Sequence, residues 1–328
     1  MKKLALVVVA LVAAVPAHAA KSKYSYYRVG DPGDVATATT AGTVLMGGST
    51  DVDAAFQWLC ERSGNGDFLV IRATGTDAYN PYVEQLCPGI NSVATLVIPS
   101  STAASDPFVA PTIAEAEALW IAGGDQSDYI KEWTGTPVQA AISRHVADRK
   151  PIGGTSAGMD VLTQYVYSAL GSKGVTSSAA LANPYDKYVT LARDFATVPN
   201  LEGAIGDTHF AARDRMGRNI AFLCRIAAAG WNAAPRAIDI DEETALLVDG
   251  DGRVAVTGLG NAYFLQAPGP AQVCQPKTPV TYLGIDVYRI DASGGYDLSR
   301  WQGRDGVSYQ LSAVEGVLRS TQAGGAIY

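Results

Sequence analysis

The chain has 328 residues, of which 48% are hydrophobic, and its 32 acidic and 25 basic side chains give a formal charge of −7 at pH 7. An acidic chain without a block of lysines or arginines is not expected to bind nucleic acid or an anionic membrane surface. The acidic net charge is more compatible with a small or cationic substrate. The length suffices for a substantial core, and because no linker is evident, residues 20–328 are predicted to form a single domain.

The first residues have the pattern of a secretory signal peptide. Lys2 and Lys3 precede an apolar run at 4–15, and Ala17 and Ala19 provide small residues for cleavage. The run is too short to span a bilayer comfortably. We therefore predict that residues 1–19 are a signal peptide and that the mature protein is soluble and either periplasmic or secreted.

Cysteine usage agrees with export. An even number of cysteines in an exported chain predicts two disulfides, and sequence proximity favours the pairs Cys60 with Cys87 and Cys224 with Cys274 among three connectivities. The spacings contain no C-x-x-C, and few histidines accompany them, so we expect neither a metal site nor a cofactor.

Short apolar runs alternate with helical patterns through the first half of the chain. This alternation predicts an α/β fold with a mostly parallel sheet covered by helices on both faces, and such sheets bind ligands at the carboxyl ends of their strands. The expected strands lie at 43–48, 67–74, 94–100 and 118–124, and the expected helices at 51–62, 81–87, 113–119 and 137–149.

Later in the chain, residues 243–266 contain two β-rich runs around the turn-forming sequence Asp249-Gly250-Asp251-Gly252. This pattern predicts an antiparallel hairpin in the C-terminal part of the chain.

Gly154-Thr155-Ser156-Ala157-Gly158 fits the G-x-S-x-G pattern of a nucleophile elbow. It follows a very short apolar strand and precedes a helical pattern at 157–170, which places Ser156 at a strand-to-helix junction. The glycines of "GGDQ" (123–126) close another strand and let backbone N–H groups turn toward an oxyanion. We therefore expect the backbone at Gly124 and Ala157 to form an oxyanion hole, with Asp125 or Ser127 capping the next helix.

A serine nucleophile needs a base, which is usually histidine. His145 lies on the apolar stripe of a helix, where a structural role is expected, so His209 is the predicted base. The acid that orients it is expected among four residues at the start of a strand: Asp239, Asp241, Glu242 and Glu243.

Asp207 is close to His209 in sequence, but on an extended strand it would lie beside the histidine and not behind its ring. Arg213, Arg215 and Arg218 follow the histidine. They could clamp substrate carboxylates or simply form a solvated helix surface.

Four motifs together resemble a known family. "IAGGDQ", "IGGTSAGM", "DTHFAARDRMGRN" and "IDIDEETALLV" occur in this order, and the chain from about residue 44 onward resembles cyanophycinase and, more distantly, peptidase E. The resemblance implies a flavodoxin-like sheet related to class I glutamine amidotransferases. It also implies a serine exopeptidase with Ser156 as nucleophile, His209 as base and Glu242 as acid.

The resemblance further implies a β-aspartyl peptide or cyanophycin as substrate, with release of β-aspartyl-arginine. The implied pocket residues are Gln126, Asp207, Arg213, Arg215 and Arg218. Thr208 stands where the family usually has glutamine, so a pocket contact is expected to differ.

The sequence is also compatible with three other functions. They are an isoaspartyl peptidase of different specificity, an esterase of the α/β-hydrolase type and a secreted binding module. The sequence also leaves open whether the protein forms a homodimer.

Overall fold

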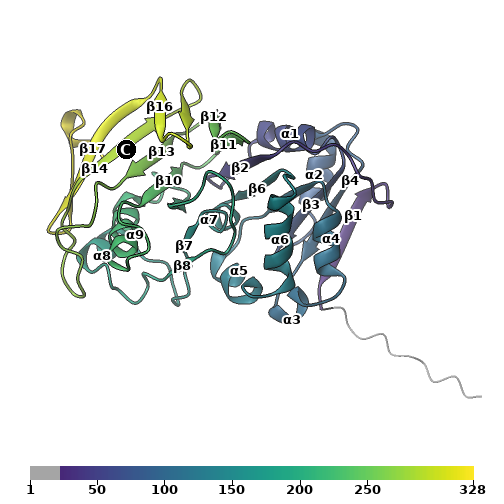
Figure 1. The fold of residues 1–328 in the computed structure, drawn as a ribbon, viewed down its shortest axis with the longest axis horizontal. Coiled ribbons are helices and arrows are strands. Elements are labelled where there is room, and N and C mark those ends of the chain that lie inside the picture. Colours follow the sequence, from purple (N-terminus) through teal and green to yellow (C-terminus); the bar gives the residue numbers. More distant parts are fainter. Residues whose placement is uncertain (1–22) are drawn as a thin grey trace, which may run out of the picture.

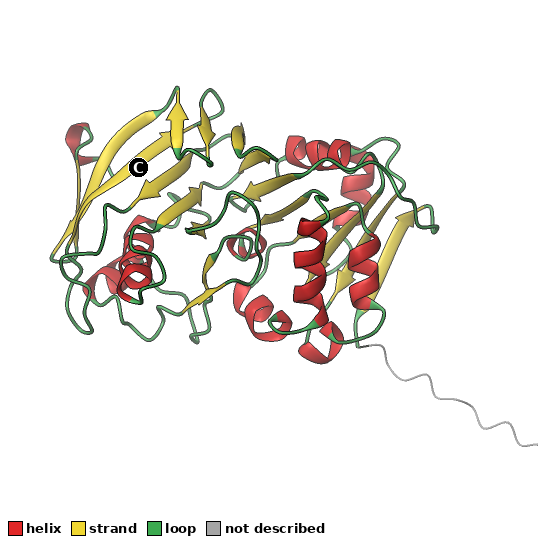
Figure 2. Cartoon of the chain, in the orientation of Figure 1, coloured by secondary structure: helices red, strands yellow, loops and turns green. Residues whose placement is uncertain are grey.

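The computed structural model describes residues 23–328, so the predicted signal peptide lies outside the described residues. Two sheets lie side by side, a larger one formed mainly by the first half of the chain and a smaller one formed by the second half (Figure 1). Helices gather around the first sheet, whereas strands dominate the C-terminal part (Figure 2).

The larger sheet has ten strands, in the order β1-β4-β3-β5-β6-β2-β11-β12-β15-β16. The five strands from β4 to β2 are parallel to one another. Their buried apolar runs are typical of parallel strands covered on both faces. Strands β3 to β6 follow the 2-1-3-4 order of flavodoxin-like sheets, and β2 lies where the fifth strand of that fold would be. The strands are β1 (Ser25–Gly30), β2 (Gly42–Met46), β3 (Asp67–Arg72), β4 (Ser92–Val97), β5 (Ala118–Ile121), β6 (Ile152–Thr155), β11 (Thr244–Asp249), β12 (Arg253–Gly258), β15 (Gly295–Asp297) and β16 (Gln302–Arg304).

Helices cover both faces of the parallel strands, as predicted. Val44 and Met46 of β2 belong to one apolar cluster, which includes residues of α1 and α2, whereas Leu45 between them belongs to a second cluster with residues of α3 to α6. The period of two residues thus sends alternate side chains to opposite faces. The helices are α1 (Asp53–Arg62), α2 (Tyr79–Leu86), α3 (Ser101–Ala104), α4 (Val109–Glu115), α5 (Gln126–Trp133) and α6 (Pro137–Ala147).

The smaller sheet has eight strands, in the order β18-β17-β14-β13-β10-β9-β7-β8, and only β10, β9 and β7 are parallel. Helices α8 and α9 pack against it through a third apolar cluster. The elements are β7 (Tyr165–Tyr167), β8 (Leu191–Arg193), β9 (Ala204–Asp207), β10 (Arg236–Ile240), β13 (Ala262–Gln266), β14 (Tyr282–Ile290), β17 (Val307–Val314), β18 (Val317–Ser320), α7 (Ala157–Asp160), α8 (Ser177–Ala182), α9 (Met216–Ala228) and the short 3-10 helix η1 (Ala323–Gly325).

The α/β class and the β11–β12 hairpin are confirmed, but the sequence analysis underestimated the C-terminal part. It predicted a hairpin, whereas the chain there also forms most of a second sheet. In the hairpin turn, Asp249 Oδ1 accepts hydrogen bonds from the backbone N–H groups of Asp251 and Arg253, and Gly252 has a φ of 86°.

The predicted helix at 157–170 was wrong. Helix α7 ends at Asp160, and residues 165–167 form β7. The hydroxyl of Thr163, a buried residue, donates to the carbonyls of Asp160 and Tyr165. Tyr165 and Tyr167 then stack on aromatic rings of the second half of the chain. Packing against distant segments therefore outweighs the local helical pattern.

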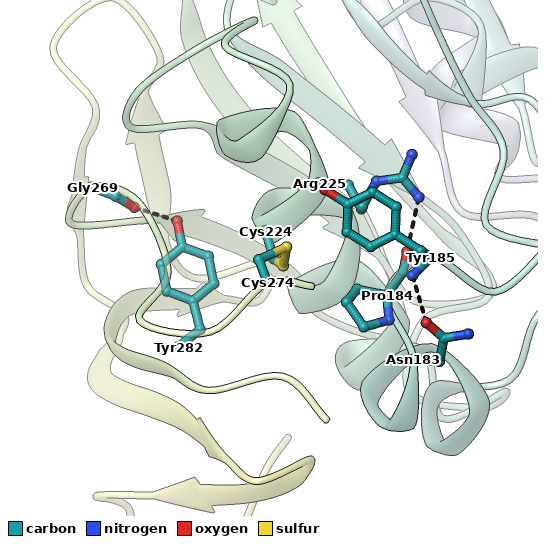
Figure 3. Close-up of a disulfide and its surroundings, with 8 residues drawn as sticks. All are labelled: Asn183, Pro184, Tyr185, Cys224, Arg225, Gly269, Cys274 and Tyr282. Atoms are coloured by element: carbon teal, nitrogen blue, oxygen red, sulfur yellow. Dashed lines mark hydrogen bonds between the residues drawn. A yellow bond between two sulfur atoms is a disulfide. The ribbon is translucent and has the colours of Figure 1, made fainter. Parts of the chain in front are cut away.

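The structure pairs Cys60 with Cys87 and Cys224 with Cys274, which are the pairs favoured by sequence proximity. Cys60 is in α1 and Cys87 follows α2, so the first bond ties two helices on one face of the parallel sheet. The second ties α9 to the segment before β14 (Figure 3). Within the described part of the chain, no helix is long and apolar enough to cross a membrane.

Removing either disulfide should lower the free energy of unfolding, because the unfolded chain gains conformational entropy. The sequence separations are 27 and 50 residues. For loops of this size, loop-closure entropy predicts a loss of about 3 to 4 kcal/mol in the free energy of unfolding. We expect the double serine variants C60S/C87S and C224S/C274S each to show this loss in urea unfolding. If a variant unfolds at the same urea concentration as the oxidised parent, that bond contributes no stability.

Candidate active site

Ser156 lies on a strained turn between β6 and α7. Its φ of 50° and ψ of −121° fall outside the regions that residues other than glycine normally adopt. Its N–H donates to the Met46 carbonyl at 3.0 Å. Close packing explains the flanking glycines, because a Cβ at Gly154 would lie 2.5 Å from the Gly158 carbonyl group and one at Gly158 would lie 2.0 Å from the Ile121 oxygen. The G-x-S-x-G sequence thus forms the sharp strand-to-helix turn of a nucleophile elbow.

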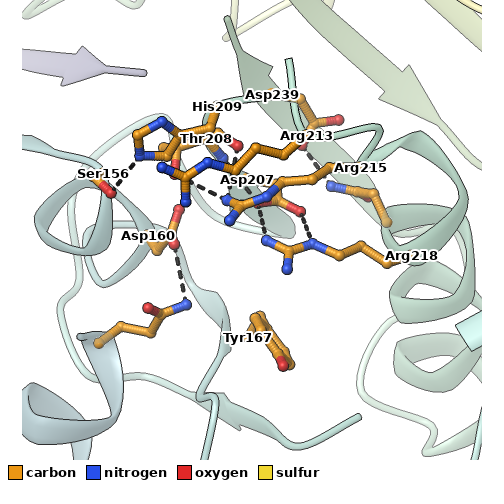
Figure 4. A network of polar contacts seen from close by, with 12 residues as sticks. Ser156, Asp160, Tyr167, Asp207, Thr208, His209, Arg213, Arg215, Arg218 and Asp239 are labelled. Carbon is orange, nitrogen blue, oxygen red and sulfur yellow. Dashed lines mark hydrogen bonds and ion pairs between the residues drawn. The ribbon is translucent and has the colours of Figure 1, made fainter. Parts of the chain in front are cut away.

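Three side chains form a hydrogen-bonded chain at this turn. Ser156 Oγ lies 2.9 Å from His209 Nε2 (Figure 4), and His209 Nδ1 lies 2.6 Å from Glu242 Oε1. His209 follows β9, and Glu242 lies in the short connection from β10 to β11. The serine therefore comes from the larger sheet, the imidazole from the smaller sheet and the carboxylate from the chain that joins them. This geometry allows the imidazole to accept the serine proton while the carboxylate fixes its tautomer.

Gly47 and Gly48, just after β2, hold these groups together. The Gly47 carbonyl accepts a hydrogen bond from His209 N–H at 2.8 Å, and the Gly48 carbonyl accepts one from Glu243 N–H at 3.0 Å. Gly48 has a φ of 91°, and a Cβ there would lie 2.5 Å from His209 Cε1 and Nε2. The sequence analysis missed this role. The available signal was a pair of glycines at the carboxyl end of a buried strand.

The four candidate acids have different partners. Glu242 contacts the His209 ring, whereas Asp241 accepts backbone N–H groups from Ala211 and Asn261. Glu243 accepts the Thr50 hydroxyl. Asp239 is fully buried and accepts the amide of Asn219.

The other described histidine, His145, is 1% exposed, and its Nε2 lies 3.0 Å from the Pro151 carbonyl oxygen. Burial lowers the pKa of His145 to about 4. This environment is that of a structural histidine, as expected.

Burial also lowers the pKa of His209, and the positive charges of Arg213 and Arg215 lower it further. The hydrogen bond that His209 donates to Glu242 raises the pKa of His209 but does not outweigh burial. His209 is therefore neutral at neutral pH, which is the state that a general base requires.

The three arginines that follow His209 differ in their partners and in their exposure. Arg218 donates to both Asp207 oxygens, at 2.7 and 2.6 Å, and Arg215 donates to Asp207 Oδ1 at 3.0 Å. Asp207 and Arg218 are buried, and the arginines hold the pKa of Asp207 below its usual range. Only Arg213 is largely exposed, with Nε 3.7 Å from Glu242 Oε1. The alternative of a solvated helix surface is thus wrong for Arg218, and Asp207 lies among the arginines and not behind His209.

Gln126, Thr208 and Asp160 lie together beside Ser156. Gln126 begins α5 after the N-cap Asp125, and its side-chain amide donates to Asp160 Oδ2 at 3.3 Å. Thr208 is fully buried, and its hydroxyl favours the charged form of Asp160. The sequence analysis did not single out Asp160, although its position one helical turn after Ser156 was a usable signal.

Of the two residues predicted to form the oxyanion hole, Ala157 directly follows Ser156, and Gly124 follows a glycine that lies close to it. Ala157 is the first residue of α7, and the loop at Gly123 and Gly124 passes Ser156, so that a Cβ on Gly123 would lie 3.6 Å from the Ser156 Cβ. For metals, residues 23–328 contain no group of three or more His, Cys, Asp or Glu side chains placed to hold an ion.

Comparison with known proteins agrees with this site. Residues 39–182 match the model of peptidase family S51. Cyanophycinases of Synechococcus elongatus and of Thermosynechococcus vestitus are each 26% identical to the chain over 174 residues. The match to the family model covers less than half of the chain. The family match includes Ser156 and Gln126, whereas His209 and Glu242 lie beyond it.

The alignment with each of these cyanophycinases covers 53% of this chain and 49% of the relative, so the chain spans about half the length of the curated relatives it matches. Among solved structures, a peptidase from an acI-B1 actinobacterium is 17% identical with a TM-score of 0.49, over 69% of this chain and 91% of that chain. A putative peptidase E protein from Listeria monocytogenes EGD-e is 13% identical with a TM-score of 0.43, over 68% and 100% of the two chains.

Replacing Gly48 by alanine should disable Ser156, because the new methyl group would meet the His209 ring. We expect Gly48→Ala to slow the labelling of Ser156 by a fluorophosphonate by about 100-fold or more, in line with the cost of misplacing a catalytic group by about 1 Å. Gly89→Ala is the matched control, since Gly89 has a similar φ of 89° and open space around it. Equal labelling rates in the two variants would contradict the role assigned to Gly48.

Proposed function

We propose that this protein is a serine exopeptidase that hydrolyses β-aspartyl substrates. The observation that carries the proposal is the hydrogen-bonded chain from Ser156 through His209 to Glu242 on a strained elbow. The match of residues 39–182 to the model of peptidase family S51 supports it.

In the proposed reaction, His209 Nε2 takes the proton of the Ser156 hydroxyl as Oγ attacks the scissile carbonyl carbon. The resulting oxyanion is stabilised by the backbone N–H groups of Gly124 and Ala157. The protonated imidazole then gives its proton to the leaving amine, and an acyl-enzyme on Ser156 remains. Water, deprotonated by His209, hydrolyses this ester and restores the serine. Glu242 keeps Nδ1 protonated and stabilises the imidazolium throughout.

Cyanophycin is the substrate that we favour, with β-aspartyl-arginine as product. Two relatives carry the name cyanophycinase. The arginine cluster supports binding of a substrate rich in carboxylates, because Arg213 and Arg215 add positive charge close to His209. Gln126, Thr208, Asp207 and Arg218 complete the proposed pocket.

An isoaspartyl peptidase of different specificity is the alternative that one observation favours. Thr208, which stands where the resemblance leads us to expect glutamine, is fully buried and lies against Asp160. A pocket contact to the substrate is therefore replaced by a contact within the protein.

We also propose that the protein acts after export, in a periplasm or outside the cell. Two disulfides support this, since such bonds persist mainly in oxidising compartments. The signal-peptide pattern of residues 1–19 also supports export.

The decisive test is to incubate the purified protein with cyanophycin and with isoaspartyl dipeptides and to identify the products by mass spectrometry. We expect β-aspartyl-arginine from cyanophycin. Ser156→Ala and His209→Ala should each lower kcat by about 10⁴-fold or more while leaving thermal unfolding unchanged, because the triad acts as a unit. Cleavage of isoaspartyl dipeptides alone would favour the alternative specificity. Substantial turnover by either variant would refute the triad.

The pH dependence of Ser156 reactivity tests the roles of His209 and Glu242. Because the pKa of His209 is lowered, fluorophosphonate labelling should rise with pH to a plateau with a midpoint below 6.5. Glu242→Gln removes a contact that raises this pKa, so the midpoint should fall further, and the plateau rate should drop by about 10- to 10⁴-fold.

Glu243→Gln is the matched control for that experiment, since Glu243 is the neighbouring acid and contacts Thr50. It should leave the midpoint in place. An upward shift of the midpoint in Glu242→Gln would rule out the assignment of Glu242.

A further inference from the structure

Asp160 is a buried acid beside the nucleophile that the proposed mechanism does not use. It ends α7, and its N–H donates to the Ser156 carbonyl at 3.0 Å, so the two residues are joined by one helical turn. The residue is 2% exposed. Figure 4 shows its carboxyl group close to Ser156 and Thr208 and facing the guanidinium groups of the arginines.

Among the described residues, only one oxygen of the Asp160 carboxyl group has a hydrogen-bond partner. Oδ2 accepts from the Gln126 amide, whereas Oδ1 is buried and has no hydrogen-bond partner. The Thr208 hydroxyl is near but does not form a well-aligned bond to Oδ1. A buried polar atom without a hydrogen-bond partner destabilises the protein, and a ligand that supplies the partner removes this cost.

The charges around Asp160 determine which kind of ligand group would bind its unpaired Oδ1. In residues 23–328, no lysine or arginine forms an ion pair with Asp160, because Arg215 and Arg218 are both bound to Asp207. Two guanidinium groups around one carboxylate leave an excess positive charge that faces Asp160. This excess favours a negatively charged group on the ligand.

The groups facing Asp160 come from several elements. Burial is the main cause that raises its pKa, to about 8, and Asp207 on β9 raises it further, whereas Arg215, Arg218 and the Thr208 hydroxyl lower it. Asp239 on β10 faces the same cluster, and burial raises its own pKa well above the usual value. At neutral pH the Asp160 carboxyl is therefore protonated and can donate a hydrogen bond.

We propose that Asp160 is a specificity-determining residue whose Oδ1 hydroxyl donates a hydrogen bond to the free α-carboxylate of a terminal β-aspartyl-arginine unit bound beside Ser156. The proposal rests on the proposed β-aspartyl function. Gln126 positions the carboxyl through Oδ2, and the excess charge of the arginines attracts the same carboxylate. When pH rises through about 8, Asp160 ionises, its donor is lost and its charge repels the ligand.

Binding can be measured apart from turnover in the Ser156→Ala protein, by isothermal titration calorimetry with β-aspartyl-arginine at pH 7 and pH 9.5. We expect the Kd to rise at least tenfold between these values. The ligand's own amino group titrates in this range, so the decisive comparison is with S156A/D160N, in which the rise should be at least fivefold smaller. S156A/D251N is the control, because Asp251 lies in the exposed turn between β11 and β12, and it should behave like S156A.

A second measurement needs no change at residue 160. An analogue of β-aspartyl-arginine with a carboxamide in place of the α-carboxylate should bind S156A more weakly at pH 7 and with at least fivefold less dependence on pH. Failure of β-aspartyl-arginine to bind at pH 7, or equal pH dependence in S156A and S156A/D160N, would overturn the proposal. If S156A shows the expected behaviour but the wild-type protein cleaves no β-aspartyl peptide, the proposed function fails while the role of Asp160 stands.

Discussion

The site depends on the close approach of two sheets at Gly47 and Gly48. A Cβ at Gly47 would lie 1.9 Å from the Asp241 oxygen, and a Cβ at Gly48 would meet His209. Only glycines let the end of β2 contact the β9 and β10 ends of the smaller sheet this closely. The hydrogen bonds from His209 and Glu243 to these two carbonyls then fix the distance between Ser156 and the imidazole.

Strained backbone conformations are concentrated around this contact between the two sheets. Ser156, His209 and Glu243 have φ values of 50°, 46° and 54°, although none of them is a glycine. Such conformations persist only where surrounding contacts impose them, and they are concentrated at functional sites. Here the contacts come from both sheets, so the strain at Ser156 and His209 is supported by the packing of the two sheets and not by a local turn.

Part of this arrangement could be predicted from the sequence. Ser156 and the alternation of strands and helices are local patterns, and His209 was the better placed of the two histidines that follow residue 19. The acid could be narrowed to four residues by position, and only the resemblance favoured Glu242. Gly48 and Asp160 were missed, because their importance comes from contacts with residues more than 100 and about 50 positions away. Likewise, β7 and the second sheet depend on aromatic packing between distant segments, which no local period of residues reveals.

The distribution of Ser156, His209 and Glu242 over two sheets and their connection has a consequence for folding. A chain that has formed only the larger sheet holds Ser156 without the imidazole, and the smaller sheet alone holds His209 without the serine. The hydrogen-bonded chain that joins the three side chains is therefore complete only when the two sheets have packed together.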